Sequence, residues 1–397
     1  MHTSERVNKI HISPTMQVAA KAKKMKDEGI DVIDLSVGEP DFPTPHNIKE
    51  AAKKAIDENQ TRYTINAGTI ELRKAIAQKL KRDNHLDYNL NEIIVSNGAK
   101  QCVYNSVLAI VNDGDEVIIP APYWVSYPDM VRMANGKIIF IETKESNGFK
   151  LKPEQLESAI TAKTKVLILC NPSNPTGSAY TKNELEVLAE VINGKNIFII
   201  SDEIYEKLTY GDFKFVSFAS LSNEMKKRTI VVNGISKTYS MTGWRIGYAA
   251  GPGDIIEAMN KIQSHSTSNA SSVSQAAAIE ALAGPQYVIS EMLEEFKQRQ
   301  DYFHKELTSL NGITCYKPEG AFFLFPNVSH YFGKSTGVFK IKHSFDFAMH
   351  ILYEAHIAAV PGSAFGAEGY MRFAYATSME NLKEAILRLK KVLSKLK

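Results

Sequence analysis

Residues 196–203, NIFIISDE, form a continuous apolar segment that ends directly in two acidic residues, Asp202 and Glu203. Similar short apolar runs, bounded by turn residues, occupy residues 116–122, 137–143, 165–172, 229–234 and 245–251. Short runs without polar alternation are typical of strands that are buried on both faces. The sequence therefore predicts an α/β fold in which a mostly parallel sheet lies between layers of helices.

Helical patterns separate these runs and also mark a change of organisation late in the chain. Residues 98–111 and 181–192 are predicted helices, and a capping box of Thr181 and Glu184 begins the second one. After about residue 285, a long charged helix precedes three candidate strands, AFFLFP, IAAVPG and MRFAYA, which suggests a smaller α+β unit. We therefore predict an N-terminal segment packed on the small domain, a large domain and a small C-terminal domain, at residues 1–45, 46–285 and 286–397.

The bulk composition narrows the possible partners. A net charge of +3 over 397 residues gives no reason to expect a nucleic-acid or membrane partner. Cys102, Cys170 and Cys315 are far apart and match no metal or redox spacing, so we expect free thiols, mostly buried, and no metal site. We find no signal-peptide pattern and no apolar run of membrane-spanning length, and we expect a cytoplasmic protein.

Polar side chains follow three of the predicted strands. An acid after a strand is, by itself, more often a helix cap than a catalyst, and each of these groups alone is a weak signal. Ligands of doubly wound sheets collect beyond the carboxyl ends of the strands, so these side chains are expected at one edge of the sheet. The group consists of Asn174, Asp202, Tyr205, Ser236, Lys237 and Arg245.

A lysine in a closed, partly dry site can lose its proton and form a Schiff base with an aldehyde cofactor such as pyridoxal phosphate. The cofactor also needs a carboxylate at its ring nitrogen, donors to its phenolate oxygen and an anion site for its phosphate. Asp202 suits the first need, and Tyr205 and Asn174 suit the second. Ser236, Arg245 and a helix N-terminus suit the third.

That helix N-terminus is predicted in VSNGAKQCVYN, which is interpreted as a strand end, a glycine turn and then a helix. The free amides of Gly98, Ala99 and Lys100 would point at an anion. A cation in the first turn opposes the helix dipole. Lys100 is therefore either a surface lysine that tolerates a small penalty or a lysine placed to meet a bound anion.

The motifs taken together resemble the class I aminotransferases of pyridoxal-phosphate fold type I, and most of all the bacterial branch of aspartate and prephenate aminotransferases. The resemblance covers nearly the whole chain. It is strongest in DLSVGEPDFPTP, PYWVSYPDMV, NPSNPTG, SDEIYE, SKTYSMTGWRIGY and VPGSAFG. It implies a seven-stranded sheet in the large domain, pyridoxal phosphate as the cofactor, and a homodimer with shared active sites.

The resemblance also implies roles for single residues. Lys237 matches the Schiff-base lysine that moves the substrate proton, and Arg372 in YMRFAYA matches the clamp on the substrate α-carboxylate. Without the family, Arg372 would be interpreted as a surface residue of an edge strand, and Trp124 as core packing. The remaining matches are Asp202 at the ring nitrogen; Tyr205 and Asn174 at the phenolate oxygen; Trp124 stacked on the ring; Gly98, Ala99, Lys100, Ser236 and Arg245 at the phosphate; Tyr63 at the partner's phosphate; and Gly38, Trp124 and Asn174 beside the substrate.

The choice of substrate depends on fewer residues. The branch that this chain resembles binds the distal carboxylate with a lysine at the position of Lys100 and with hydroxyls at Ser13 and Thr15. The resemblance therefore implies an aspartate aminotransferase (EC 2.6.1.1) that uses 2-oxoglutarate. His11 stands where prephenate-using members often have Lys or Arg, so prephenate use stays open, as does a broader aromatic or alanine specificity.

Two other classes are compatible with the same scaffold. One is a carbon–sulfur lyase or decarboxylating synthase, which Arg372 and Lys100 disfavour. The other is a binding or regulatory protein, which would be expected to carry a winged-helix domain and to have lost Lys237. We expect an enzyme.

Overall fold

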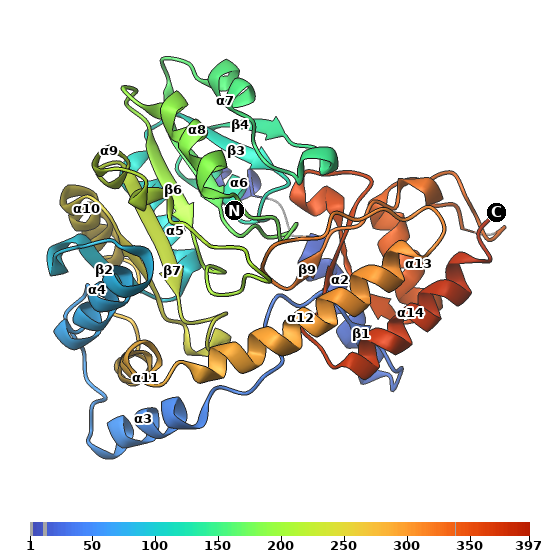
Figure 1. The fold of residues 1–397 in the computed structure, drawn as a ribbon, viewed down its shortest axis with the longest axis horizontal. Coiled ribbons are helices and arrows are strands. Elements are labelled where there is room, and N and C mark those ends of the chain that lie inside the picture. The colour runs from blue at the N-terminus through green and yellow to red at the C-terminus, as the bar shows by residue number, and fades with distance from the viewer. Residues whose placement is uncertain (1–2, 11–13, 338) are drawn as a thin grey trace.

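The computed structural model describes residues 3–10, 14–337 and 339–397, and its largest feature is a seven-stranded sheet (Figure 1). The strand order is β2-β8-β7-β6-β5-β3-β4. All neighbouring strands are parallel except β8, which is antiparallel to β2 and to β7. The strands are β2 (Ile93–Ser96), β3 (Glu116–Ala121), β4 (Lys137–Glu142), β5 (Thr164–Cys170), β6 (Phe198–Asp202), β7 (Thr229–Gly234) and β8 (Gly247–Ala250).

Both faces of this sheet are buried except at the edge strand β4, where Phe140 is 43% exposed. Val166 and Ile168 of β5 pack on one face, in a core formed with helices α5 (Ala99–Ile110), α6 (Tyr127–Met133) and α10 (Gly253–Ser264). Leu167 and Leu169 of the same strand point to the opposite face, where α7 (Pro153–Ala159) and α8 (Lys182–Ile192) cover them. Helices α3 (His46–Asp57), α4 (Ile70–Asn84) and α11 (Ser272–Ala283) cover that face beside β2, β8 and β7. Burial on both sides explains the continuous apolar runs, and the predicted α/β fold is confirmed.

The chain continues through a long helix, α12 (Tyr287–Thr308), which runs from beside α11 to the C-terminal elements (Figure 1). These elements are a three-stranded antiparallel sheet, β11-β12-β9, together with α13 (Ser344–Ala355) and α14 (Met379–Leu393). The strands are β9 (Phe323–Leu324), β11 (Val360–Pro361) and β12 (Met371–Ala374). The predicted strands are present, but IAAVPG contains two short ones, β10 (Ile357–Ala358) and β11.

The N-terminal residues pack against elements from the other end of the chain. Strand β1 (Ile33–Asp34) pairs in parallel with β10. Helix α2 (Pro14–Asp27) inserts Val18 and Ala22 into an apolar cluster that also contains Leu352 of α13. The division into three domains at residues 45 and 285 stays a prediction.

The state of the cysteines and the character of the helices bear on what the composition predicted. Cys102 is buried, Cys170 and Cys315 are partly buried, and all three are free thiols. In the described ranges, no helix combines the length and the apolar character that crossing a membrane requires.

Candidate functional site

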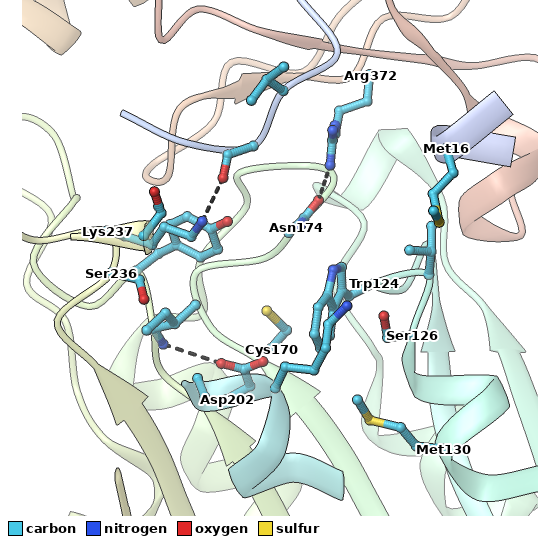
Figure 2. A pocket seen from close by; sticks show the side chains of 18 of the residues that line it. Met16, Trp124, Ser126, Met130, Cys170, Asn174, Asp202, Ser236, Lys237 and Arg372 are labelled. Carbon is cyan, nitrogen blue, oxygen red and sulfur yellow. Dashed lines mark hydrogen bonds between the residues drawn. The ribbon is translucent and has the colours of Figure 1, made fainter. Parts of the chain in front are cut away.

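A cavity of about 670 Å³ lies beyond the carboxyl ends of β5, β6 and β7 (Figure 2). Asn174 follows β5, Asp202 ends β6, and Lys237 follows β7, so the sheet delivers three predicted groups to one place. The N-terminal segment, α5, α6 and β12 contribute further lining residues. The predicted residues that line the cavity are Gly38, Ala99, Lys100, Trp124, Asn174, Asp202, Tyr205, Ser236, Lys237, Arg245 and Arg372.

The other predicted residues do not line this cavity. Gly98 is the N-cap residue of α5, next to the lining residue Ala99. Tyr63 is 92% exposed and is not among the residues that line the cavity. Ser13 and His11 lie outside the described residues, and of Thr15 the structure describes only its place in α2.

Lys237 is held close to the backbone of the N-terminal segment. Its Nζ donates a hydrogen bond of 2.5 Å to the carbonyl oxygen of Gly38 (Figure 2). Burial lowers the pKa of Lys237 to about 8, and the positive charges of Arg372 and Arg245 act in the same direction. A substantial fraction of Lys237 is therefore an uncharged, nucleophilic amine at mildly alkaline pH.

Asp202 has a partner that sequence reasoning missed. The phenol of Tyr127 donates a hydrogen bond of 2.7 Å to Asp202 Oδ2, and the amide of Ile204 donates one of 3.3 Å to Oδ1. Burial raises the pKa of Asp202, whereas both hydrogen bonds lower it. The Tyr127 ring also meets Trp124 edge-on, with 5.2 Å between centroids. The only available signal was the three-residue spacing of Trp124 and Tyr127 at the start of α6.

Arg245 lies against the N-terminus of α5. Its Nη1 donates to the carbonyl of Thr242 at 2.8 Å, and its Nη2 donates to the carbonyl of Asn97 at 3.2 Å. Gly98 has a φ of +88°, and a Cβ at this position would overlap the Arg245 guanidinium. A bare backbone therefore lets a guanidinium and the free amides of a helix N-terminus lie together, which makes an anion site.

Arg372 is buried, with 4% of its surface exposed. Its Nη1 donates to Asn174 Oδ1 at 3.0 Å, and its Nη2 donates to the carbonyl of Ser36 at 2.6 Å. Its Nε has no hydrogen-bond partner among the described residues. Burial lowers the pKa of Arg372 to about 10. Because β12 is the middle strand of its sheet and the side chain is buried, the alternative of an edge-strand surface arginine is wrong.

Lys100 is in the first turn of α5, and its Nζ lies 5.0 Å from the centroid of the Trp124 ring. The side chain is accessible to solvent through the mouth of the cavity. Enough protein nevertheless surrounds the amine that burial lowers the pKa of Lys100, and Arg245 adds to the effect. Neither Lys100 nor Arg372 forms an ion pair with any residue that the structure describes.

The far wall of the cavity, beyond Trp124, contains residues that sequence reasoning did not select. Met16 of α2 and Met130 of α6 lie there, with Ser126 between them and Trp124 (Figure 2). Cys170 lines the cavity next to Asp202. In the sequence, a methionine at helical spacing looks like an ordinary core residue, so these methionines could not be predicted as part of the cavity.

Comparisons with known proteins agree with this arrangement. The aminotransferase class I and II family model matches residues 30–389, and the chain belongs to this family. The aspartate aminotransferase of Bacillus subtilis is 48% identical over 395 residues, which cover 100% of both chains. A probable aspartate/prephenate aminotransferase of Rickettsia felis is 50% identical over 98% of this chain and 95% of its own.

Solved structures of the same kind superimpose closely. The aspartate aminotransferase of Rhizobium meliloti matches with a TM-score of 0.97 and 45% identity, and the match covers 100% of each chain. The Thermus thermophilus aspartate aminotransferase with maleate gives a TM-score of 0.93 and 39% identity, over 99% of this chain and 100% of the other. The resemblance inferred from the sequence motifs is confirmed.

Proposed function

We propose that this chain is an aspartate aminotransferase that moves an amino group from L-aspartate to 2-oxoglutarate, giving oxaloacetate and L-glutamate in a ping-pong reaction. The observation that carries this proposal is the presence of two cations, Arg372 and Lys100, in one cavity, neither of them paired with an acid among the described residues. A substrate with a carboxylate at each end would supply the two missing anions.

The cavity fits pyridoxal phosphate, which the family implies. The Arg245 guanidinium lies against the bare backbone of Gly98 at the N-terminus of α5, and this pairing of a cation with free helix amides suits a phosphate. Bound there, the cofactor supplies an aldehyde that accepts the amino group and a ring that withdraws electrons from the substrate's Cα. The residues proposed to hold it are Gly98, Ala99, Lys100, Ser236 and Arg245 at the phosphate, Asp202 at the ring nitrogen, Tyr205 and Asn174 at the phenolate oxygen, Trp124 on the ring face, and Lys237 at the aldehyde carbon.

Lys237 is the group proposed to take and return the proton at the substrate's Cα. An effective general base has a pKa near the working pH, and burial lowers that of Lys237 to about 8. Asp202 contributes negative charge at the opposite side of the cavity. The hydrogen bond from Tyr127 favours this charge against the effect of burial.

Arg372 is proposed to bind the α-carboxylate. A planar guanidinium can present two parallel N–H donors to a carboxylate, which lysine cannot do. Asn174 and the Ser36 carbonyl fix its orientation by accepting hydrogen bonds from its two terminal nitrogens. Lys100 is proposed to bind the distal carboxylate, which accounts for a cation in the first turn of a helix.

A bifunctional aspartate/prephenate aminotransferase is a second candidate, since relatives that are about half identical to this chain carry that name. Prephenate also has two carboxylates, but it is bulkier than aspartate. The methionines on the far wall, Met16 and Met130, are unbranched and adapt to different shapes.

The purified enzyme, loaded with pyridoxal phosphate, tests these alternatives directly. Aspartate and phenylalanine are assayed with 2-oxoglutarate, alanine is assayed in the same way, and prephenate is assayed with glutamate. We expect the highest kcat/KM with aspartate. Turnover of alanine comparable to that of aspartate would exclude a dicarboxylate site, and rapid prephenate turnover would establish the bifunctional enzyme.

Replacement of Lys100 separates binding of the substrate from binding of the cofactor. A hydrogen bond to a charged group is worth about 1.5–3 kcal/mol, so Lys100→Ala is expected to lower kcat/KM for aspartate by about ten- to a hundredfold. The loss with phenylalanine, which has no distal carboxylate, is expected to be much smaller. Equal losses with both amino acids would mean that Lys100 serves only the cofactor.

A further inference from the structure

Two cations of the cavity, Arg372 and Lys100, rest on aromatic rings. The guanidinium carbon of Arg372 lies 4.6 Å from the ring centroid of Phe323 and 5.1 Å from that of Phe365. The Nζ of Lys100 lies 5.0 Å from the ring centroid of Trp124. These separations are within the range of cation–π attraction, which strengthens when the groups are removed from water.

An aromatic support differs chemically from an acidic one. A buried arginine needs a partner, and a carboxylate would be the usual choice. A carboxylate next to Arg372 would, however, neutralise the charge that a substrate carboxylate has to meet. A ring face attracts the cation without adding a formal negative charge, so the guanidinium stays available to an incoming anion.

The two rings are themselves fixed in the core. Phe323 and Phe365 both have 0% of their surface exposed. Phe323, in β9, meets Tyr205 edge-on at 5.8 Å, and Phe365 meets Phe325 edge-on at 5.9 Å. Phe323 and Phe365 therefore have little freedom to move, and they restrict the position of a guanidinium that packs on them.

We propose that Phe323 and Phe365 are positioning residues for substrate binding, which hold the Arg372 guanidinium on their ring faces and leave its charge for the substrate's α-carboxylate. This inference rests on the proposed function, because it takes Arg372 as the carboxylate receptor. Ser36 and Asn174 fix the in-plane direction of the guanidinium, and the rings fix the plane itself.

The first experiment uses Phe323→Leu and Phe365→Leu in the enzyme loaded with pyridoxal phosphate, with maleate as a non-reacting dicarboxylate and calorimetry as the readout. We expect each variant to bind maleate about tenfold more weakly, because a desolvated cation–π contact is lost. In assays with aspartate, KM should rise more than kcat falls. The visible absorption of the cofactor should not change in Phe365→Leu, since that ring packs on Arg372, which is not among the residues proposed to hold the cofactor. Phe323 packs against Tyr205, so Phe365→Leu is the variant that isolates the effect on Arg372.

The matched control is Phe303→Leu, the same change at another fully buried phenylalanine of the core that contains Phe323; Phe303 packs edge-on against Phe373. It should lose thermal stability as the two test variants do, but bind maleate as the unchanged enzyme does. If Phe303→Leu weakens maleate binding as much as Phe323→Leu, the rings act only through general packing and the inference is wrong.

A double-mutant cycle then asks whether the effect passes through Arg372. Glutamine carries no positive charge for a ring face to attract, so in an Arg372→Gln background we expect Phe323→Leu to change kcat/KM by less than about twofold. The same factor in both backgrounds would overturn the inference. An unchanged enzyme that neither binds maleate nor transaminates aspartate would instead reject the proposed function, and the inference with it.

Discussion

At the scale of single residues, Tyr127 connects two groups proposed to hold the cofactor ring. Removing its phenol in Tyr127→Phe takes away a 2.7 Å hydrogen bond to Asp202, a contact worth about 1.5–3 kcal/mol. Since that bond lowers the pKa of Asp202 and burial raises it, the pKa is expected to rise further in the variant. We expect a lower kcat at pH 7 and a larger loss as the pH falls.

The measurement is the pH profile of kcat, whose acid limb should move to higher pH in Tyr127→Phe. Tyr331→Phe is the matched control, because this largely buried phenol donates its hydrogen bond to the Asn311 carbonyl, away from the cavity. An acid limb that stays in place in Tyr127→Phe would show that Tyr127 does not tune Asp202.

Glu203, the next residue after Asp202, is a second buried acid with a different environment. Its Oε1 accepts hydrogen bonds from Ser201 at 2.8 Å and from Ser217 at 2.7 Å, and its Oε2 has no partner among the described residues. Burial raises the pKa of Glu203 to about 8, and the nearby charge of Glu206 adds to this rise. Between pH 4.5 and about 8, the folded chain therefore binds one proton that the unfolded chain does not.

Stability should consequently fall as the pH rises through this window. Glutamine imitates the protonated acid, so Glu203→Gln should remove this dependence, and its Tm relative to the unchanged protein should increase steadily from pH 5 to pH 8. Thermal unfolding at several pH values checks this, with the exposed Glu190→Gln as control. A constant difference in Tm across the range would show that Glu203 does not take up a proton on folding.

At the scale of elements, the N-terminus of α5 depends on a glycine. Gly98→Ala would place a methyl group on the Arg245 guanidinium at a backbone φ of +88°. We expect a clear loss of affinity for pyridoxal phosphate, measured by titration of the apoenzyme. Gly114→Ala is the control, because it has a similar φ of +80° but open space around it. It should cost stability only, about 1 kcal/mol. Equal affinities in both variants would contradict an anion site at this helix.

The elements that could be predicted from sequence are those whose signal is local. The capping box of Thr181 and Glu184 is present as predicted. It could be predicted because its two hydrogen bonds join residues only three positions apart. The six apolar runs are all strands of the large sheet, since burial on both faces leaves a continuous pattern. Only the end of strand β2 was predicted, because a strand of four residues is too short to show a clear hydrophobic pattern. The reversed direction of β8 is invisible in its composition.

The sequence predicted most residues of the site, but some of them only through the resemblance to a family. Strand ends brought Asn174, Asp202 and Lys237 together by a general rule, but only the resemblance to a family selected Arg372 and Trp124. The contacts of Tyr127 and Phe323 are tertiary, between residues far apart in sequence. No local pattern in the sequence reveals a phenol that donates a hydrogen bond to a distant carboxylate, or a ring that packs under a distant arginine.

At the scale of the whole molecule, Tyr63 points to a second subunit. Tyr63 is 92% exposed and Ile65 is 53% exposed, so both side chains are available to a partner surface. We propose a homodimer in which Tyr63 contacts the partner's phosphate site. Sedimentation should give twice the chain mass, and Tyr63→Phe should weaken pyridoxal-phosphate binding while the dimer persists. A monomer with full cofactor affinity would contradict this proposal.

The pairing of β1 with β10 has a consequence for how the protein folds. Ile33 lies opposite Ile357, and its amide donates a hydrogen bond to the carbonyl of His356, so this strand pair joins two segments that are far apart in the sequence. Contacts of such long sequence separation form slowly, and unpaired apolar segments aggregate while they wait. The large sheet between Ile93 and Ala250 can pair its own strands earlier. The segment that supplies Gly38 to the cavity is thus held by a contact that closes a long loop of chain, and a working site depends on that slow closure.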